Sequence, residues 1–445
     1  MSRSDPIAAI ATAPGRAAIG IVRLSGPDLR AFGNQITGRA LEPRQATRAV
    51  FRDGVGEPID EGIALYFPAP GSYTGEDVLE LQGHGGMVVL RTLLERCVEL
   101  GARIAEPGEF TQRAFLNGKI DLVQAEGVID LIDASTGQAA RSALKSLQGE
   151  FSTKIQSLNA QLIELRALVE ATLDFPEEEI DPLDLRGASE RLARLRSDLE
   201  AVLAAARQGS LLREGLHIVL AGRPNVGKSS LLNRLAGGNV AIVTEIPGTT
   251  RDVIREAIDI DGVPVHILDT AGLRDSTDPV ERIGVERAWG AIGGADLLLL
   301  VSDAQSGLGD EERAILARVP PELERIHVVN KIDLTGAVAA LTEQNSQTTV
   351  LLSAKTGAGV DLLREAILAR AGWAGQPEGV FLARERHLSA LQRARDELSA
   401  ASARPAPELF AEHLRLGHEA LMSITGEFGA DDLLGAIFQR FCIGK

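Results

Sequence analysis

Apolar positions in the first part of the chain come in short runs bounded by turn residues. These runs predict strands at 18–24, 62–67 and 77–82. Apolar residues at helical spacing occupy 87–100, and Gly101 follows as a typical helix-ending residue. Residues 1–118 are therefore expected to form an α+β domain.

After residue 119 the spacing changes to steps of three and four. One apolar stripe from 144 to 173 predicts a single long amphipathic helix. A second helix follows from 185 and is expected to break at 208–210, where the sequence reads Gln-Gly-Ser.

The same helical spacing returns after residue 372. Apolar residues mark three segments, at 388–398, 410–424 and 433–441. Neither this block, 372–445, nor the earlier one, 119–210, is expected to bury a core alone. We therefore expect one all-α domain made from both, with residues 211–371 inserted between close-lying ends.

The inserted part alternates strands with helices, which is typical of a doubly wound parallel sheet. Its first strand, 216–221, is followed by Gly222-Arg-Pro-Asn-Val-Gly-Lys228-Ser229, the G-x-x-x-x-G-K-S spacing of a phosphate-binding P-loop. Glycines let backbone amides turn toward a polyphosphate at a helix N-terminus. Lys228 is expected on the β- and γ-phosphates and Ser229 on Mg²⁺.

Three later tetrapeptides favour guanine over adenine. Asp269-Thr-Ala-Gly272 follows a strand, with Asp269 expected near Mg²⁺ and the Gly272 amide at the γ-phosphate. In Asn330-Lys-Ile-Asp333, the Asp333 carboxylate can accept bonds from guanine N1–H and its amino group. Adenine lacks both donors, so ATP would leave the carboxylate unmatched. The backbone of 353–355, Ser-Ala-Lys, would complete the base pocket.

The residues leave the mechanism of hydrolysis open. Leu273 stands where Ras-like enzymes carry the water-positioning glutamine. A carboxylate among Asp275, Asp278, Glu281 and Glu286 could replace it, and their positions do not rank them.

The role of Asn225 is equally open. Thr250 is expected on Mg²⁺. Asn225, with oxygens of the loop 244–249, could form a cage for a monovalent cation that supplies the charge of an arginine finger. It could equally satisfy only the loop backbone.

Composition limits the partners. The net charge of −16 opposes nucleic-acid binding by the whole surface, so RNA contact requires a local basic patch or a partner.

Two cysteines, Cys97 and Cys442, suit a reducing cytosol, and no signal-peptide pattern is visible. The longest strongly apolar run, 297–301, is too short to span a bilayer. A cytoplasmic protein is expected.

Over its full length the chain resembles the MnmE (TrmE) family of tRNA uridine-modifying GTPases. The resemblance rests on the P-loop, on Pro247-Gly-Thr-Thr-Arg-Asp, on Asp269-Thr-Ala-Gly-Leu-Arg, on 72–86 and on Cys442-Ile-Gly-Lys. It implies a Ras-like P-loop GTPase domain, 211–371, inserted into an all-α helical domain, 119–210 with 372–445. An α+β folate-binding and dimerisation domain, 1–118, precedes them.

The resemblance also implies site residues. Arg23, Glu80, Lys119 and Lys445 match tetrahydrofolate-binding positions for a 5-formyl or 5,10-methylene derivative, although the first three taken alone are ordinary surface charges. Glu281 matches the catalytic glutamate. K⁺ would be held by Asn225, Thr244, Ile246 and Thr249. The GTP-binding positions are Asn225, Val226, Gly227, Lys228, Ser229, Ser230, Thr244, Glu245, Ile246, Pro247, Gly248, Thr249, Thr250, Asp269, Thr270, Ala271, Gly272, Asn330, Lys331, Asp333, Ser353, Ala354 and Lys355.

In such a family the reaction has two protein components. The GTPase forms a homodimer and joins the flavoprotein MnmG (GidA) in a heterotetramer. Together they add a (carboxymethyl)aminomethyl-type group to C5 of the wobble uridine, position 34, of certain tRNAs. Cys442 matches a near-terminal cysteine for which a covalent and a packing role are both open.

Two other functions share these features. A ribosome-assembly GTPase would have the same P-loop, Pro-Gly-Thr-Thr and Leu273, but usually carries a basic appendage that this sequence lacks. A regulatory switch without chemistry would use 1–118 only to dimerise.

Overall fold

The computed structural model describes residues 5–174, 182–237, 256–269, 293–344, 347–375, 379–403, 406–426, 437–438, 441 and 444. The chain forms two compact units. One unit comprises Met1–Ile129 with Met422–Lys445, and the other comprises Asp130–Leu421.

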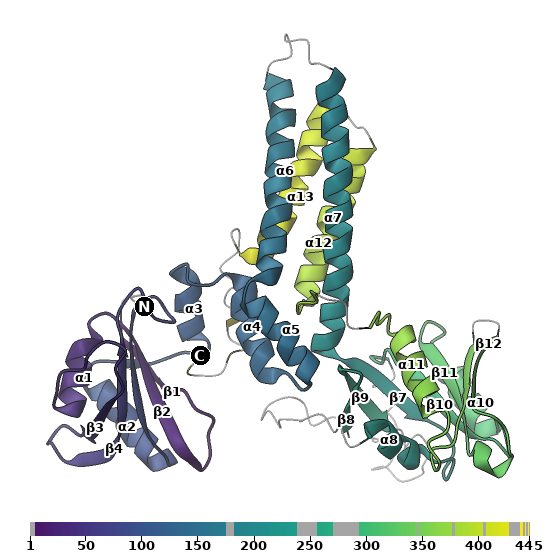
Figure 1. Ribbon diagram of the computed structural model, residues 1–445, viewed down its shortest axis with the longest axis horizontal. Helices are drawn as coiled ribbons and strands as arrows, with labels where there is room; N and C mark the ends of the chain where they lie inside the picture. The colour runs from purple at the N-terminus through teal and green to yellow at the C-terminus, as the bar shows by residue number, and fades with distance from the viewer. Residues whose placement is uncertain are drawn as a thin grey trace. The chain divides into compact units, whose positions relative to one another are not determined.

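The first unit is built on a six-stranded sheet of order β3-β4-β5-β2-β1-β6, antiparallel except for the β1–β6 pair (Figure 1). Helices α1 and α2 pack their apolar side chains against one face. On the other face Phe110 of α3 packs against Ile7 and Ala9. The elements are β1 (Ile7–Ile10), β2 (Ala17–Gly26), α1 (Leu29–Thr37), β3 (Thr47–Arg52), β4 (Pro58–Phe67), β5 (Asp77–Gly85), α2 (Met87–Glu99), β6 (Arg103–Ile104), α3 (Glu109–Leu116) and α4 (Leu122–Asp133).

The C-terminal residues complete this unit. Ile437, Phe438 and Phe441 pack on Leu122 and Ala125 of α4. Gly444 has φ +103°, and a Cβ there would lie 2.6 Å from the carbonyl oxygen of Ile10.

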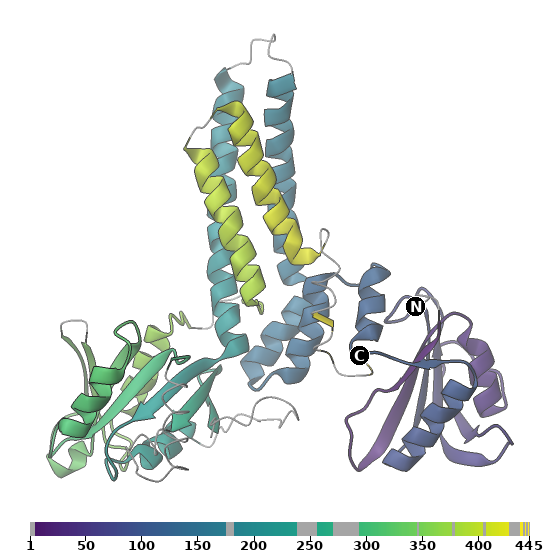
Figure 2. The same ribbon diagram turned by 180° about the vertical axis from the view of Figure 1, so that it is seen from behind.

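The second unit contains a bundle of long helices. In Figure 2, α12 and α13 run alongside α7 and α6. The ring of Phe151, near the start of α6, stacks on the ring of Phe381, just before α12, with their centroids 4.2 Å apart. The bundle elements are α5 (Gly137–Leu147), α6 (Glu150–Asp174), α7 (Pro182–Glu214), α12 (Glu385–Ser402) and α13 (Pro407–Thr425).

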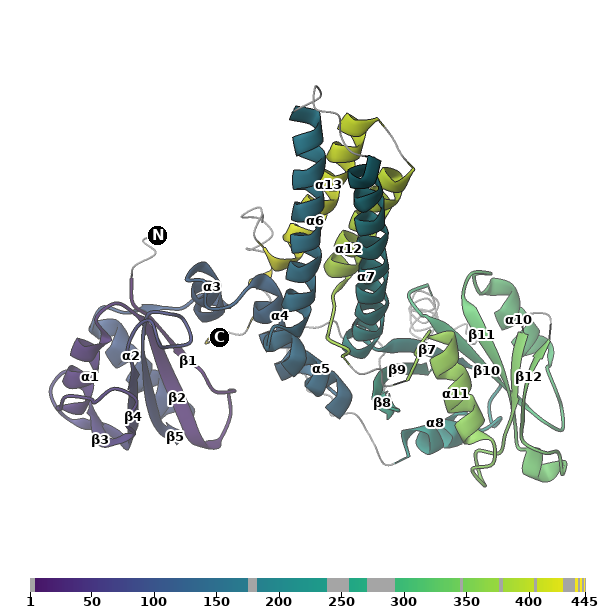
Figure 3. The same cartoon turned by 45° about the horizontal axis from the view of Figure 1, so that its top comes forward.

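The same unit contains a seven-stranded sheet of order β12-β13-β11-β10-β7-β9-β8. The five inner strands are parallel, and β8 and β12 are antiparallel edges. Helices α8 and α11 pack on one face and α10 on the other (Figure 3). The elements are β7 (Leu216–Ala221), α8 (Lys228–Ala236), β8 (Glu256–Ile260), β9 (Val263–Asp269), β10 (Leu297–Asp303), α10 (Asp310–Arg318), β11 (Glu324–Asn330), the 3₁₀ turn η1 (Ile332–Leu334), β12 (Ala340–Gln344), β13 (Gln347–Leu351) and α11 (Val360–Arg370).

The predicted doubly wound sheet is present, and so are the helical segments predicted from 185, at 388–398 and at 410–424. The segment predicted at 433–441 lies mostly outside the described residues. Two other helix predictions were wrong. The stripe from 144 to 173 is divided into α5 and α6 at Gly149, whose φ of +88° ends the first helix. Leu144 is consequently 42% exposed. The expected break at 208–210 is absent, since α7 runs to Glu214.

Gly209 has a packing role in α7 instead. A Cβ on it would lie 1.8 Å from the carbonyl oxygen of Phe381. The glycine therefore lets the segment before α12 cross α7 in close contact. Among the described residues, no helix has both the length and the apolarity needed to cross a membrane.

Candidate nucleotide site

The P-loop lies between β7 and α8, and its glycines fill positions that a side chain cannot. Gly222 has φ +147°, and a Cβ there would lie 2.2 Å from the carbonyl oxygen of Val301. Gly227 has φ +100°, and its Cβ would lie 2.4 Å from Asn330 Nδ2. The loop is thus pressed against the ends of the neighbouring strands β10 and β11.

Lys228 begins α8 and extends back over the loop. Its Nζ donates to the carbonyl oxygens of Gly222, at 2.6 Å, and Arg223, at 3.1 Å. Ser229 and Ser230 lie in the first turn of α8, and both are exposed. A cationic amine and hydroxyls at a helix N-terminus form a donor set that fits a polyphosphate and Mg²⁺.

Asn330 joins the P-loop to the two downstream motifs. Its Nδ2 donates to the carbonyl oxygen of Val226 at 2.8 Å. Its Oδ1 accepts from the backbone N–H of Ala354 at 2.9 Å and of Lys331 at 2.8 Å. Asn330 is 2% exposed, so these bonds are shielded from water.

The Asp333 carboxylate is exposed at the edge of this arrangement. Its Oδ1 accepts a 2.6 Å bond from the hydroxyl of buried Ser353. On the other side of the loop, Arg234 of α8 donates to the carbonyl oxygens of Ala354 and Lys355. The predicted base-binding residues are therefore held from both sides.

Lys331 forms an ion pair with Asp303 at the end of β10. The two charged groups are 2.8 Å apart. The hydrogen bond from Lys331 holds the pKa of the Asp303 carboxyl below its ordinary value, with a smaller contribution from the backbone amide of Gln305. Lys331 itself has φ +66°, which places its stem at a sharp turn after β11.

Asn225 also has a left-handed backbone, with φ +62°, and its side chain is exposed. It makes no side-chain hydrogen bond to the described residues. The predicted residues that lie outside the described part are Thr244, Glu245, Ile246, Pro247, Gly248, Thr249, Thr250, Thr270, Ala271, Gly272, Leu273, Asp275, Asp278, Glu281, Glu286, Cys442 and Lys445, together with the side chain of Asp269. Within the described part, no group of three or more His, Cys, Asp or Glu residues is arranged around a metal site.

A second predicted site lies on the sheet of the first unit. The Arg23 Nε and Nη2 atoms lie 2.9 and 2.8 Å from Glu80 Oε1. Arg23 also donates to the carbonyl oxygen of Gly444, and its guanidinium lies 6.0 Å from the Phe110 ring. Lys119 bonds instead to the carbonyl oxygen of Pro70 at 3.0 Å. Arg23 and Glu80 are thus in direct contact, whereas Lys119 bonds to neither.

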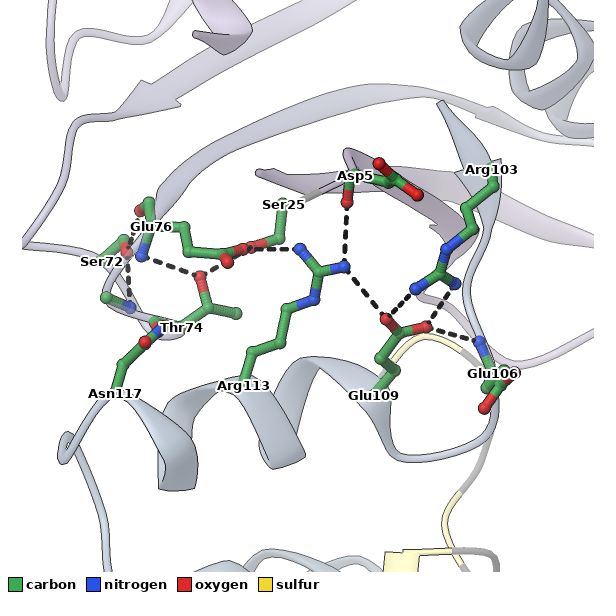
Figure 4. A network of polar contacts seen from close by, with 11 residues as sticks. Asp5, Ser25, Ser72, Thr74, Glu76, Arg103, Glu106, Glu109, Arg113 and Asn117 are labelled. Carbon is green, nitrogen blue, oxygen red and sulfur yellow. Dashed lines mark hydrogen bonds and ion pairs between the residues drawn. The ribbon is translucent and has the colours of Figure 1, made fainter. Parts of the chain in front are cut away.

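Sequence reasoning missed a buried polar network beside this site (Figure 4). Arg113 bonds to Glu76 at 2.9 Å and to Glu109 at 3.0 Å, and Arg103 also pairs with Glu109. Burial raises the pKa of Glu109, but bonds from Arg103, the Glu106 amide and Arg113 outweigh it and keep the pKa low. The i,i+4 spacing of Glu109 and Arg113 in a short helix was the one available signal.

Cys97 is excluded as a nucleophile. It lies in the core of the first unit, and burial raises the pKa of its thiol to about 12. A thiol with that pKa stays protonated near neutral pH.

A P-loop against a doubly wound sheet, joined by one asparagine to the predicted base-binding loops, defines a P-loop GTPase domain. Two family models match the chain, "MnmE helical domain" over residues 122–442 and "GTP-binding protein TrmE N-terminus" over residues 6–119. The chain belongs to the MnmE family.

Curated relatives agree with this assignment. A tRNA modification GTPase MnmE from Laribacter hongkongensis is 60% identical over 99% of both chains. That of Chromobacterium violaceum is also 60% identical, over 99% of this chain and 98% of its own. Among solved structures, a variant of Aquifex aeolicus Era bound to GDP·AlF4⁻ is 28% identical and covers 41% of this chain and 66% of its own. Its TM-score of 0.28 is too low for a comparison of folds.

Proposed function

We propose that this chain hydrolyses GTP at the site between the P-loop and residues 330–355, and that hydrolysis drives modification of tRNA. The observation that carries the first part is the Asn330 side chain, which ties the phosphate-binding loop to both base-binding loops. Family membership supports the second part, because the curated relatives are named tRNA modification GTPases.

In this proposal different residues of the chain bind the phosphates, hold Mg²⁺, select the base and position the water. Lys228 and the loop amides bind the β- and γ-phosphates, and Ser229 with Thr250 holds Mg²⁺. Asp333 selects guanine, and Ser353 holds the carboxylate in place through its hydroxyl. Glu281 positions the attacking water. Mg²⁺ supplies charge to the developing oxyanions when it is bound.

K⁺ is proposed as the substitute for an arginine finger. The exposed Asn225 amide, which makes no hydrogen bond to the described residues, is available to a cation together with Thr244, Ile246 and Thr249. We expect GTP turnover to fall about tenfold or more when K⁺ is replaced by Na⁺ at equal ionic strength. Steady-state phosphate release measures it, and equal rates in the two salts would remove the cation from the mechanism.

The first unit is proposed to bind a reduced folate, 5-formyl- or 5,10-methylene-tetrahydrofolate. The Arg23–Glu80 pair, partly exposed beside the Phe110 ring, offers both donors and acceptors to a heterocycle. Lys119 and Lys445 would add cationic contacts. The folate would supply the one-carbon unit, and a homodimer joined to the flavoprotein MnmG (GidA) would install the C5 group on the wobble uridine in the cytoplasm.

Mass spectrometry of tRNA from cells lacking this chain tests the modification. Loss of the C5 substituent at position 34 is expected, and complementation with wild-type chain should restore it. Complementation with Lys228→Ala should fail. Intact wobble uridines in the deletion strain would contradict the proposal and favour another GTPase role.

A further inference from the structure

An ion pair links the start of the P-loop to helix α10. The backbone N–H of Arg223 and its Nε both donate to Glu312 Oε1, at 3.2 and 2.8 Å. Its Nη2 donates to Ser306 Oγ and to the carbonyl oxygen of Gly307, both at 2.9 Å. One residue of the loop therefore makes four bonds to the segment 306–312.

The Glu312 carboxylate is completely buried, with 0% exposure of its side chain. Burial alone raises its pKa, but the bonds from Arg223 and the Gly309 amide outweigh it and keep the pKa below the ordinary value. Its second oxygen, Oε2, accepts the Gly309 N–H at 3.0 Å and caps α10. A buried, ionised carboxylate that lost Arg223 would be left without its charged partner.

The other end of this segment contacts the base-binding loop. Asp303 pairs with Lys331, and the backbone N–H of Ala304 donates to the carbonyl oxygen of Asn330 at 2.9 Å. Residues 303–312 thus connect the first residues of the P-loop to the loop that selects the base. Sequence reasoning gave this segment no role.

Arg223 also affects the phosphate-binding lysine. The Arg223 carbonyl oxygen accepts from Lys228 Nζ, while the amide and guanidinium of the same residue are held by Glu312. Gly222, immediately before it, lies so close to the carbonyl oxygen of Val301 that a Cβ would not fit between them. The position of this carbonyl therefore depends on the ion pair.

We propose that Arg223 and Glu312 are positioning residues for the nucleotide, holding the first peptide of the P-loop where Lys228 and the loop amides receive the polyphosphate. Neither residue touches the nucleotide in this proposal. It depends on the proposed nucleotide site. The competing interpretation is that Glu312 only caps α10 and Arg223 only covers its carboxylate.

The test measures release of a fluorescent GDP by stopped flow in the full chain, together with KM and kcat for GTP. Arg223→Ala and Glu312→Gln should speed GDP release about tenfold or more, as expected for the loss of charge-assisted bonds. KM should rise with the release rate and kcat should change less. Arg223→Lys, which keeps the charge, should restore part of the affinity.

The matched control is Arg313→Ala. Arg313 lies on the same helix, is 70% exposed and pairs only loosely with Asp310 at 3.6 Å. It should release GDP at the wild-type rate. If Glu312→Gln does not fold, the two Arg223 variants carry the test, because they leave the Gly309 cap of α10 in place.

The positioning role and the nucleotide site can be refuted separately. A lowered melting temperature with wild-type GDP release in Arg223→Ala would make the pair purely structural and end this proposal. Lys228→Ala should abolish GDP binding, and normal binding there would overturn the nucleotide site itself. Weak binding in Lys228→Ala with normal release in Arg223→Ala overturns the positioning role alone.

Discussion

At the scale of single residues, Asn330 and Asp333 differ in burial and in how many of their hydrogen-bonding groups the protein itself uses. Asn330 is buried and uses its donor and its acceptor at once, so its identity is fixed by the protein. Asp333 is exposed and makes one bond to Ser353, which leaves carboxylate lone pairs for a ligand. Specificity for the base is therefore expected to depend on Asp333.

Asp333→Asn should weaken GTP binding about a hundredfold or more, because an amide cannot accept two bonds from guanine. The amide can donate to the extra carbonyl of xanthine, so xanthosine triphosphate should bind better than GTP. Competition with fluorescent GDP measures both affinities. Asp361→Asn, at an exposed position of α11, is the control. Unchanged GTP affinity in Asp333→Asn would refute the base assignment.

The lowered pKa of His266 leads us to expect that the stability of the chain depends on pH. Burial lowers the pKa of His266, and the ring of His217, 4.9 Å away, lowers it further. The folded chain then binds this proton more weakly than the unfolded chain, whose histidine has a pKa of about 6.5. The contribution to stability is complete above that pH and is lost as the pH falls below it.

Urea unfolding between pH 8 and pH 5 measures this effect. The midpoint should fall toward pH 5 in the wild-type chain and fall less in His266→Gln. An equal fall in both proteins would assign the acid sensitivity to other groups.

Residue chemistry within short motifs could be predicted from the sequence, because spacing alone brings Lys228 and Ser229 to one helix start. The Arg223–Glu312 pair could not. Its members are 89 positions apart, and each looks like an ordinary helix or loop charge until the sheet brings β7 and β10 together. The same holds for Arg113 and Glu76 in the first unit.

At the scale of elements, α7 shows why glycine is an ambiguous signal. Gly187 and Gly209 both occur within this helix. Around Gly187 a Cβ would meet nothing within 4 Å, whereas around Gly209 it would meet backbone. Periodicity predicted the helix, but whether a glycine breaks a helix or accommodates a neighbour depends on a segment far away in sequence.

Gly209→Ala should destabilise the chain by about 1–3 kcal/mol, because the methyl group overpacks the contact with Phe381. Gly187→Ala in the same helix should be stabilising by about 0.5–1 kcal/mol, since alanine favours the helix. Chemical denaturation of the two variants measures both. Equal effects would mean that the close approach at Gly209 has no energetic consequence.

At the scale of the second unit, the turn between β8 and β9 is fixed to the helical part. Thr136 Oγ1 caps α5 by accepting the Ala139 N–H and donates to the carbonyl oxygen of Gly262 at 2.8 Å. A Cβ on Gly262 would lie 2.9 Å from Gln138 Cβ. These contacts attach a hairpin of the nucleotide-binding domain to the start of a helix.

Thr136→Val should remove both bonds of the hydroxyl and cost about 1 kcal/mol, the usual effect of a lost helix cap. Amide hydrogen exchange should then accelerate in 257–262 and at the start of α5. Thr136→Ser retains the hydroxyl and is the control. Exchange in 257–262 that is unchanged by the valine would show that the turn is held by other contacts.

At the scale of the whole chain, the spacing of helical segments could predict that the helical residues on both sides of the nucleotide-binding domain belong together. It could not predict that Ile437, Phe438, Phe441 and Gly444 pack into the first unit. Their few apolar residues look like one more helix of the bundle, and only the contacts of Phe438 and Phe441 with α4 and Gly108 place them.

This arrangement has a consequence for biosynthesis. The unit that the ribosome makes first lacks some of its packing contacts until residue 444 has been translated. Phe438 and Phe441 pack on α4 and Gly108, and Gly444 lies against Ile10 and accepts a bond from Arg23. The nucleotide-binding domain, by contrast, can form while the chain is still attached. The unit at the start of the message is thus finished last, and a premature stop a few codons from the end would damage the earliest-made residues most.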